Sequence, residues 1–282
     1  MSKVGIIGAG VMGVGVAHAF AQYDHDVVLV DLSEDILNKS KKEILKNVRF
    51  SNMFNKGKKI ESSDKLINKI QFTTNYSDLS DVDFIIENVP EILEIKLMVY
   101  KKLEEVCKEN CIYLVNTSCI SITKIASVTK RNDKVIGTHF MNPVPMKKYV
   151  EAIKGYHTSE DTIEKVKELL SSIEKSVILV NDFPGFVSNR VSHLFMNEAA
   201  YTVQDGVSTA KQVDEIFKKC FEHKMGPLET ADLIGLDTVV NSLDILYDSY
   251  GDPKFRCCPL LRKMVDAGLL GVKSKEGFYK YQ

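Results

Sequence analysis

The sequence KVGIIGAGVMG (residues 3–13) decides the fold, because it joins a short apolar run to three glycines spaced as G-x-G-x-x-G. Glycines at this spacing permit a tight turn, close approach of the backbone to a pyrophosphate, and close packing of a helix on the preceding strand. The helix N-terminus that follows offers unpaired N–H groups and positive dipole to phosphates. The predicted phosphate-binding turn comprises Gly8, Gly10, Val11, Met12 and Gly13.

An acidic residue follows the second apolar run of the chain. The run DVVLV (26–30) ends directly before Asp31, at the distance where a carboxylate reaches the ribose hydroxyls of a dinucleotide. A glycine turn that merely packs a structural helix would leave Asp31 unexplained. The next residues, Leu32 and Ser33, supply no arginine for a 2′-phosphate. The sequence therefore predicts NAD as the cofactor.

Strand-like and helix-like segments alternate through the first two thirds of the chain. Short β-branched runs predict strands at 3–8, 26–30, 82–87, 111–116, 134–139, 148–153 and 176–180. Helical periodicity predicts helices near 13–23, 33–50, 91–107 and 159–174. Several of the strand runs lack polar alternation, which is typical of strands covered on both faces. This order predicts an α/β fold with a Rossmann-type, doubly wound, mostly parallel sheet.

The pattern changes at NDFPGF (181–186), where a proline and a glycine interrupt it. Beyond this point strand signals nearly vanish, and helical periodicity covers 187–204, 210–222 and 234–249. We therefore expect an NAD-binding domain at 1–183 and a smaller all-helical domain at 184–282. A length of 282 residues suits two domains. The apolar content of 184–282 exceeds what about 100 residues easily bury, which favours a homodimer formed through this domain.

Composition narrows the function classes. With 37 Lys+Arg against 38 Asp+Glu, the net charge of −1 gives no sign of nucleic-acid binding. No run approaches the ~18 apolar residues of a membrane span, and the first residues lack the layout of a signal peptide. The six cysteines show no paired CxxC spacing, so we expect free thiols and no metal site. These features predict a cytoplasmic protein.

Polar residues stand where the predicted strands end, which is where ligands bind in open α/β sheets. Glu87 ends one strand, Ser118 follows the next, and His139 ends the one after. Glu151 lies in the following predicted strand. Imidazole suits the removal of a hydroxyl proton near neutral pH, and a carboxylate on its other nitrogen would fix the tautomer. The other histidines are interpreted as structural: His18, His25, His157, His193 and His223.

Six blocks resemble the L-3-hydroxyacyl-CoA dehydrogenase family, and especially its short bacterial members that act on 3-hydroxybutyryl-CoA. They are GAGVMG (8–13), NTSCISIT (116–123), HFMNPVPMKKYVE (139–151), DFPGFVSNR (182–190), MGPLETADLIGLD (225–237) and KSKEGFYKY (273–281). The resemblance covers nearly the whole chain. It implies an NAD-dependent interconversion of short-chain (S)-3-hydroxyacyl-CoA and 3-oxoacyl-CoA, and a homodimer.

The resemblance also implies residue roles. His139 would be the acid/base and Glu151 its orienting carboxylate, while Ser118 and Asn189 would hydrogen-bond the reacting oxygen or its surroundings. Asp31 would bind the adenosine ribose. The residues implied to contact the cofactor or the pocket around it are Glu91, Lys96, Asn142 and Lys273.

The sequence departs from the family pattern at several positions. Cys119 stands where a second serine is usual, Lys275 replaces a usual glycine, and Pro90 is unusual before Glu91. Family members often hold the coenzyme A phosphates with a serine or lysines on the helix after the second strand. Here such positions carry Asn47, Phe50 and Phe54, although Lys46, Lys56 or Lys58 could serve from shifted positions.

Two other functions are compatible with these residues. A sibling dehydrogenase acting on a free 3-hydroxy acid or a sugar acid would share the serine, histidine and asparagine without needing basic residues for coenzyme A. A non-catalytic NAD-binding relative would share the fold, but it need not keep Ser118, His139, Glu151 and Asn189 together.

Overall fold

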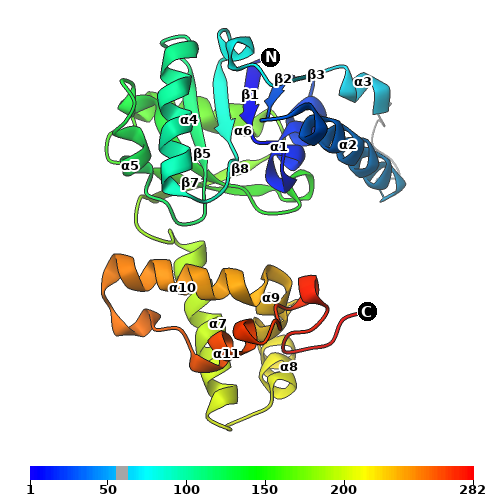
Figure 1. The fold of residues 1–282 in the computed structure, drawn as a ribbon, viewed down its shortest axis with the longest axis vertical. Helices are drawn as coiled ribbons and strands as arrows, with labels where there is room; N and C mark the ends of the chain where they lie inside the picture. The colour runs from blue at the N-terminus through cyan, green and yellow to red at the C-terminus, as the bar shows by residue number, and fades with distance from the viewer. Residues whose placement is uncertain (55–62) are drawn as a thin grey trace. The chain divides into compact units, whose positions relative to one another are not determined.

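The computed structural model describes the backbone of residues 1–54 and 63–282, and the side chains of 1–49 and 63–282. Phe50, Phe54, Lys56 and Lys58, considered above for coenzyme A, lie outside the described side chains. The chain forms two compact units, Met1–Asp182 and Phe183–Gln282 (Figure 1).

The first unit is built on an eight-stranded sheet with the order β3-β2-β1-β4-β5-β6-β7-β8. Its strands are β1 (Lys3–Ile7), β2 (Asp26–Val30), β3 (Ile70–Thr73), β4 (Phe84–Glu87), β5 (Ile112–Asn116), β6 (Val135–His139), β7 (Tyr149–Lys154) and β8 (Ser176–Asn181). All neighbours pair in parallel except β6 and β7, which are antiparallel. The predicted Rossmann-type, mostly parallel sheet is confirmed.

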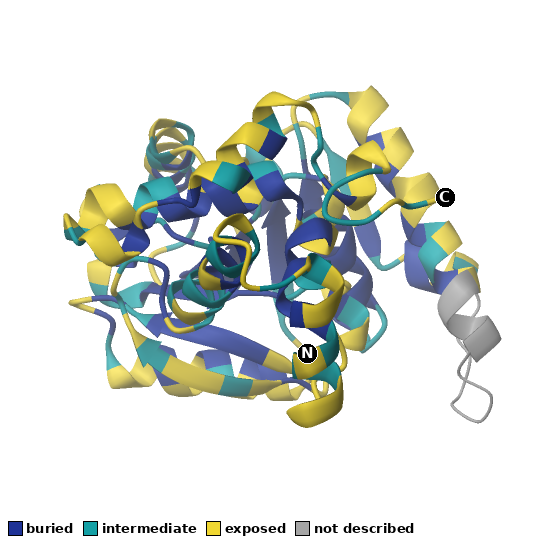
Figure 2. Ribbon diagram, turned by 90° about the horizontal axis from the view of Figure 1, so that it is seen from below, coloured by how far each residue is buried: buried dark blue, intermediate teal, exposed yellow. Residues whose placement is uncertain are grey.

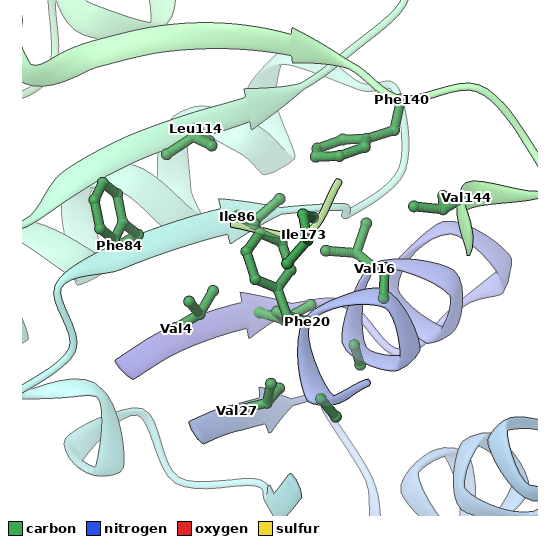
Figure 3. Packing of buried hydrophobic residues seen from close by; sticks show 14 of the residues in the cluster. Val4, Val16, Phe20, Val27, Phe84, Ile86, Leu114, Phe140, Val144 and Ile173 are labelled. Atoms are coloured by element: carbon green, nitrogen blue, oxygen red, sulfur yellow. The ribbon is translucent and has the colours of Figure 1, made fainter. Parts of the chain in front are cut away.

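Helices pack on the sheet of the first unit. They are α1 (Val11–Ala21), α2 (Glu34–Phe54), α3 (Ser63–Ile67), α4 (Leu93–Val106), α5 (Ile122–Ala126) and α6 (Glu160–Ser171). Phe20 on α1 lies among Val4 of β1 and Ile86 of β4 in one continuous core cluster (Figure 3). The central strands are buried while the outer faces of many helices are exposed (Figure 2). These contacts require the apolar runs that the sequence shows, because strands covered on both faces cannot alternate with polar residues.

The two edges of the sheet differ from expectation. The edge strand β3 was not predicted, because it has only four residues and only Ile70 among them is buried. The opposite edge strand, β8, was predicted from its apolar run. However, Ile178 and Leu179 are 55% and 39% exposed, so this run is not covered on both faces.

The second unit is helical, as predicted, with isolated β-bridges joining Gly271 to Glu276 and Glu276 to Lys280 near the C-terminus. The α-helices are α7 (Ser188–Gln204), α8 (Ala210–Cys220), α9 (Pro227–Ile234), α10 (Leu236–Tyr250) and α11 (Pro259–Asp266). The sequence patterns missed α9 and α11, which have eight residues each and are shorter than the stretch over which helical periodicity can be recognised. Buried Asp232 accepts hydrogen bonds from the backbone N–H groups of Phe278 and Tyr279 at 3.0 Å each, which fastens the C-terminal segment.

Three further features bear on the expectations from composition. Among the described residues, no helix is both long enough and apolar enough to cross a membrane. All six cysteines lie in the described part of the chain and are free thiols, of which only Cys220 is exposed. No group of three or more His, Cys, Asp or Glu side chains within residues 1–49 and 63–282 is arranged to hold a metal ion.

His18 makes the stability of the first unit depend on pH. It lies on α1, is 2% exposed, and burial lowers its pKa from 6.5 to about 4. Because the unfolded chain binds this proton more readily, stability falls as pH falls through the window from 6.5 to 4. The linkage amounts to about 2 kcal/mol between pH 7.5 and pH 5.

We therefore predict that His18→Leu loses about 2 kcal/mol less stability than the wild type between pH 7.5 and pH 5. Urea unfolding at the two pH values measures this difference. Burial also lowers the pKa of His25, so part of the pH dependence should persist in the variant. An unchanged pH dependence in His18→Leu would contradict the assignment.

Candidate active site

The glycine turn after β1 has room for a phosphate at Gly10, whereas it is closely packed at Gly8 and Gly13. Gly8 has φ +90, and a Cβ on Gly13 would lie 1.7 Å from the Gly8 carbonyl oxygen, so side chains are excluded there. A Cβ on Gly10 would meet nothing within 4 Å. The turn therefore packs tightly against the protein while its Gly10 side stays open, which fits the dinucleotide that the motif predicts.

Asp31 lies beside this turn. Its Oδ2 accepts a hydrogen bond from the N–H of Ala9 at 2.5 Å, and its Oδ1 accepts one from the N–H of Leu32 at 2.6 Å. In the same turn Val11 is 72% exposed, whereas Met12 packs against the core. The carboxylate is thus oriented at the end of β2, where the adenosine ribose of a dinucleotide would lie.

Ser118, His139 and Glu151 form one line of hydrogen bonds. The Nδ1 atom of His139 lies 3.0 Å from Oε2 of Glu151, and its Nε2 atom lies 3.2 Å from Oγ of Ser118. Antiparallel pairing of β6 and β7 places His139 directly opposite Glu151. Both side chains are nearly buried, at 8% and 9% exposure. A carboxylate on Nδ1 favours the tautomer that leaves Nε2 available to accept a proton.

Glu91 holds the turn that carries Ser118. Its Oε1 accepts hydrogen bonds from Oγ1 of Thr117 at 2.5 Å and from the backbone N–H groups of Ser118 and Cys119 at 2.8 and 2.9 Å. Three donors on one carboxylate oxygen fix the backbone of this turn. Cys119, the unusual residue here, donates its backbone N–H, which a serine at this position would also do.

Lys96 lies fully buried beneath the same turn. Its Nζ donates to both carboxylate oxygens of Glu87, at 2.8 and 2.9 Å, and to the carbonyl oxygen of Asn116 at 2.9 Å. Burial raises the pKa of the Glu87 carboxyl group, and the Lys96 ammonium opposes this rise. The sequence pattern placed Glu87 at a strand end but did not indicate that it pairs with Lys96. The two residues lie on different elements, β4 and α4, and their contact is visible only in the fold.

The remaining site residues occupy three places. Asn142 is exposed on the loop between β6 and β7. In the second unit, Asn189 lies in the first turn of α7, and Lys273 forms an ion pair with Asp237. Lys275, which replaces a usual glycine, has φ +65. Glycine adopts this left-handed conformation readily. The backbone has the same conformation here although the residue is a lysine.

The structure brings part of the predicted set together. The first unit gathers Ser118, His139, Glu151, Glu91 and Lys96 around the ends of β4 to β7. The basic face of α2 remains without an assigned role. There Lys46 is exposed and forms an ion pair with Glu43 at 3.3 Å, as expected of a solvated helix face.

Comparison with known proteins finds matches over nearly the full length of this chain. Residues 3–183 match the family model "3-hydroxyacyl-CoA dehydrogenase, NAD binding domain", and residues 185–281 match "3-hydroxyacyl-CoA dehydrogenase, C-terminal domain". A 3-hydroxybutyryl-CoA dehydrogenase of Clostridioides difficile is 45% identical over 280 residues, covering 99% of each chain.

Two further relatives give the same result. A probable 3-hydroxybutyryl-CoA dehydrogenase of Deinococcus radiodurans is 44% identical over 279 residues, covering 99% of this chain and 100% of the relative. The crystal structure of (S)-3-hydroxybutyryl-CoA dehydrogenase PaaH1 from Ralstonia eutropha superposes with a TM-score of 0.95. It is 39% identical and covers 100% of this chain and 99% of that one.

Proposed function

The chain belongs to the 3-hydroxyacyl-CoA dehydrogenase family, and we propose that it is an NAD-dependent 3-hydroxybutyryl-CoA dehydrogenase whose reaction takes place at Ser118, His139 and Glu151. The enzyme interconverts (S)-3-hydroxybutyryl-CoA and acetoacetyl-CoA. The observation that carries the assignment of the site is the hydrogen-bonded line from Ser118 Oγ through both ring nitrogens of His139 to Glu151.

The side chains of this line divide the work of proton transfer. His139 Nε2 takes the proton of the substrate hydroxyl, and the Glu151 carboxylate on Nδ1 stabilises the imidazolium that forms. Ser118 Oγ, 3.2 Å from Nε2, orients the reacting oxygen. NAD held by the glycine turn and Asp31 would supply the hydride acceptor for the oxidation of the substrate carbon. In the reverse direction, the imidazolium returns its proton to the carbonyl oxygen.

The glycine turn and Asp31 bind the dinucleotide. The backbone N–H groups at the start of α1 and the open side of Gly10 suit the pyrophosphate. Glu91 and Lys96 support the nicotinamide side of the pocket, because Glu91 holds the turn at 117–119 and Lys96 holds the carbonyl oxygen of Asn116 before it. In this proposal Asn142 of the first unit, and Asn189 and Lys273 of the second unit, take part in binding the substrate or the cofactor.

The helical domain, taken as 184–282, contributes to substrate binding and forms a homodimer. A groove of about 630 Å³ lies between α7 and α8, with Phe195, Val207 and Ile216 in its lining. Val207 and Ile216 are 76% and 49% exposed. Exposed apolar side chains that line one groove, here on α8 and on the connection before it, are typical of protein interfaces. The free cysteines agree with a cytoplasmic location.

Substitution of His139 tests the catalytic assignment. His139→Gln should lower kcat with acetoacetyl-CoA and NADH by at least about 100-fold, because a positioned base contributes about 10²–10⁴-fold. NADH binding, followed by fluorescence, should persist, since the glycine turn and Asp31 are untouched. Glu151→Gln should also lower kcat, and Ser118→Ala should act more on substrate positioning. Near-native turnover in His139→Gln would disprove the assignment.

The thioester is tested with the same assay. Turnover of acetoacetyl-CoA far above that of free acetoacetate supports the coenzyme A substrate, whereas preference for the free acid would assign the chain to the sibling activity.

Cofactor preference tests the role of Asp31. Its carboxylate should repel a 2′-phosphate, so kcat/KM with NADH should exceed that with NADPH by at least about tenfold. Asp31→Asn should reduce this preference while leaving the fold intact. Equal or better kcat/KM with NADPH in the wild type would rule out the assigned role.

Light scattering tests the homodimer. The wild type should be dimeric at micromolar concentration, and Ile216→Asp should shift it towards monomer because a carboxylate would be desolvated at the interface. Met98→Asp is the matched control, since Met98 is 63% exposed on α4 of the first unit. A monomeric wild type, or equal effects of both substitutions, would contradict the proposed interface.

A further inference from the structure

One buried lysine lies outside every role assigned so far. Lys175 stands in the connection between α6 and β8 and is 5% exposed. Its Nζ donates to the carbonyl oxygens of Val144 and Lys147, at 2.7 Å each. No carboxylate forms an ion pair with it in the described part of the chain. Burying an ammonium group is costly, so these two charge-assisted hydrogen bonds are what balances its charge.

Both acceptors lie on the loop of residues 140–148, which joins His139 to the strand of Glu151. The loop includes the short turn η3 (Val144–Met146) and carries Asn142. The N–H of Ser176 donates to the carbonyl oxygen of Lys148 at 2.8 Å, so the residue after Lys175 holds the same loop. Lys175 and the first residue of β8 thus supply three hydrogen bonds to the segment between the two proposed catalytic residues.

The loop also packs on the helix that begins at the glycine turn. Val144 and Phe140 belong to the core cluster and lie beside Val16 of α1 (Figure 3). A Cβ on Gly15 would lie only 3.1 Å from Cβ of Val144. Because the fit is close, a shift of the loop would displace α1, and a shift of α1 would displace the loop.

We propose that Lys175 is a positioning residue: by holding the carbonyl groups of Val144 and Lys147, it fixes Asn142 at the pocket and keeps His139 aligned with Glu151. This inference rests on the proposed function. Lys175 touches no reacting group. It acts through the loop, and burial lowers its pKa without any opposing carboxylate, which agrees with a cation held only by carbonyl dipoles.

Lys175→Met tests the proposal, because methionine keeps the length and the apolar stem but donates no hydrogen bond. We expect kcat to fall about 10–100-fold, since small misplacement of catalytic groups has effects of this size. The Kd of NADH should rise at least about fivefold, while that of ADP-ribose, which engages the glycine turn and Asp31, should change less than about twofold. A purely structural role would not change this ratio of affinities.

Lys165→Met is the matched control. Lys165 lies on α6, is 52% exposed in its side chain, and pairs with Asp161, so both kcat and the affinity ratio should stay at wild-type values. If Lys175→Met is folded by circular dichroism and its kcat and affinity ratio lie within twofold of the wild type, the proposal is wrong.

Gly15→Ala disturbs the same loop from α1, and it is the alternative test of the proposal if Lys175→Met does not fold. Alanine favours the helix, but its Cβ would press on Val144. It should reproduce the loss of kcat and of NADH affinity relative to ADP-ribose, and wild-type values would overturn the proposal. If the wild type turns over neither acetoacetyl-CoA nor free acetoacetate, the proposed function is wrong. The proposal for Lys175 is then still tested by the ratio of the Kd of NADH to that of ADP-ribose in Lys175→Met.

Discussion

The antiparallel pairing of β6 with β7 is the constraint on which the site depends. Every other pair of neighbouring strands in the sheet is parallel. At this one place the carboxyl end of β6 meets the amino end of β7, and the register sets His139 opposite Glu151. A slip of one residue would move the carboxylate to the other face of the sheet. The backbone pairing therefore brings the carboxylate within reach of Nδ1.

An antiparallel connection has a second consequence, because it needs no crossover helix. The chain turns back through residues 140–148, and the carbonyl groups of this short loop must find partners if they are buried. Lys175 supplies two of these partners. At the start of the loop, the N–H of Phe140 donates to Oδ1 of Asn116 at 3.3 Å. The same strand direction that pairs the proposed catalytic residues thus leaves a loop whose carbonyl groups need donors, and Lys175 is one of them.

The parts that could be predicted from sequence are those carried by local patterns. The β-branched runs and the glycine turn at 8–13 locate the parallel sheet and the dinucleotide-binding motif, because their periodicity and spacing are local. The direction of β7 and the position of β3 at the sheet edge depend on pairing between distant segments, which periodicity does not report. Ser118 and His139 are candidates from the sequence because ligands bind at strand ends in open α/β sheets. The role of Glu91 came from the resemblance, and its three donors became visible only in the fold.

Lysines show this limit most clearly. Sequence patterns do not distinguish the burial of Lys46, Lys96 and Lys175. In the structure Lys46 is solvated, whereas the other two are buried. Lys96 binds the ends of β4 and β5 through Glu87 and the carbonyl oxygen of Asn116, and Lys175 binds the loop after β6. Asn116 connects the two sides, since its Oδ1 accepts from Phe140. Hydrogen bonds to buried ammonium groups thus hold the backbone of the segments beside the candidate site, in addition to the packing of Phe140 and Val144 in the core.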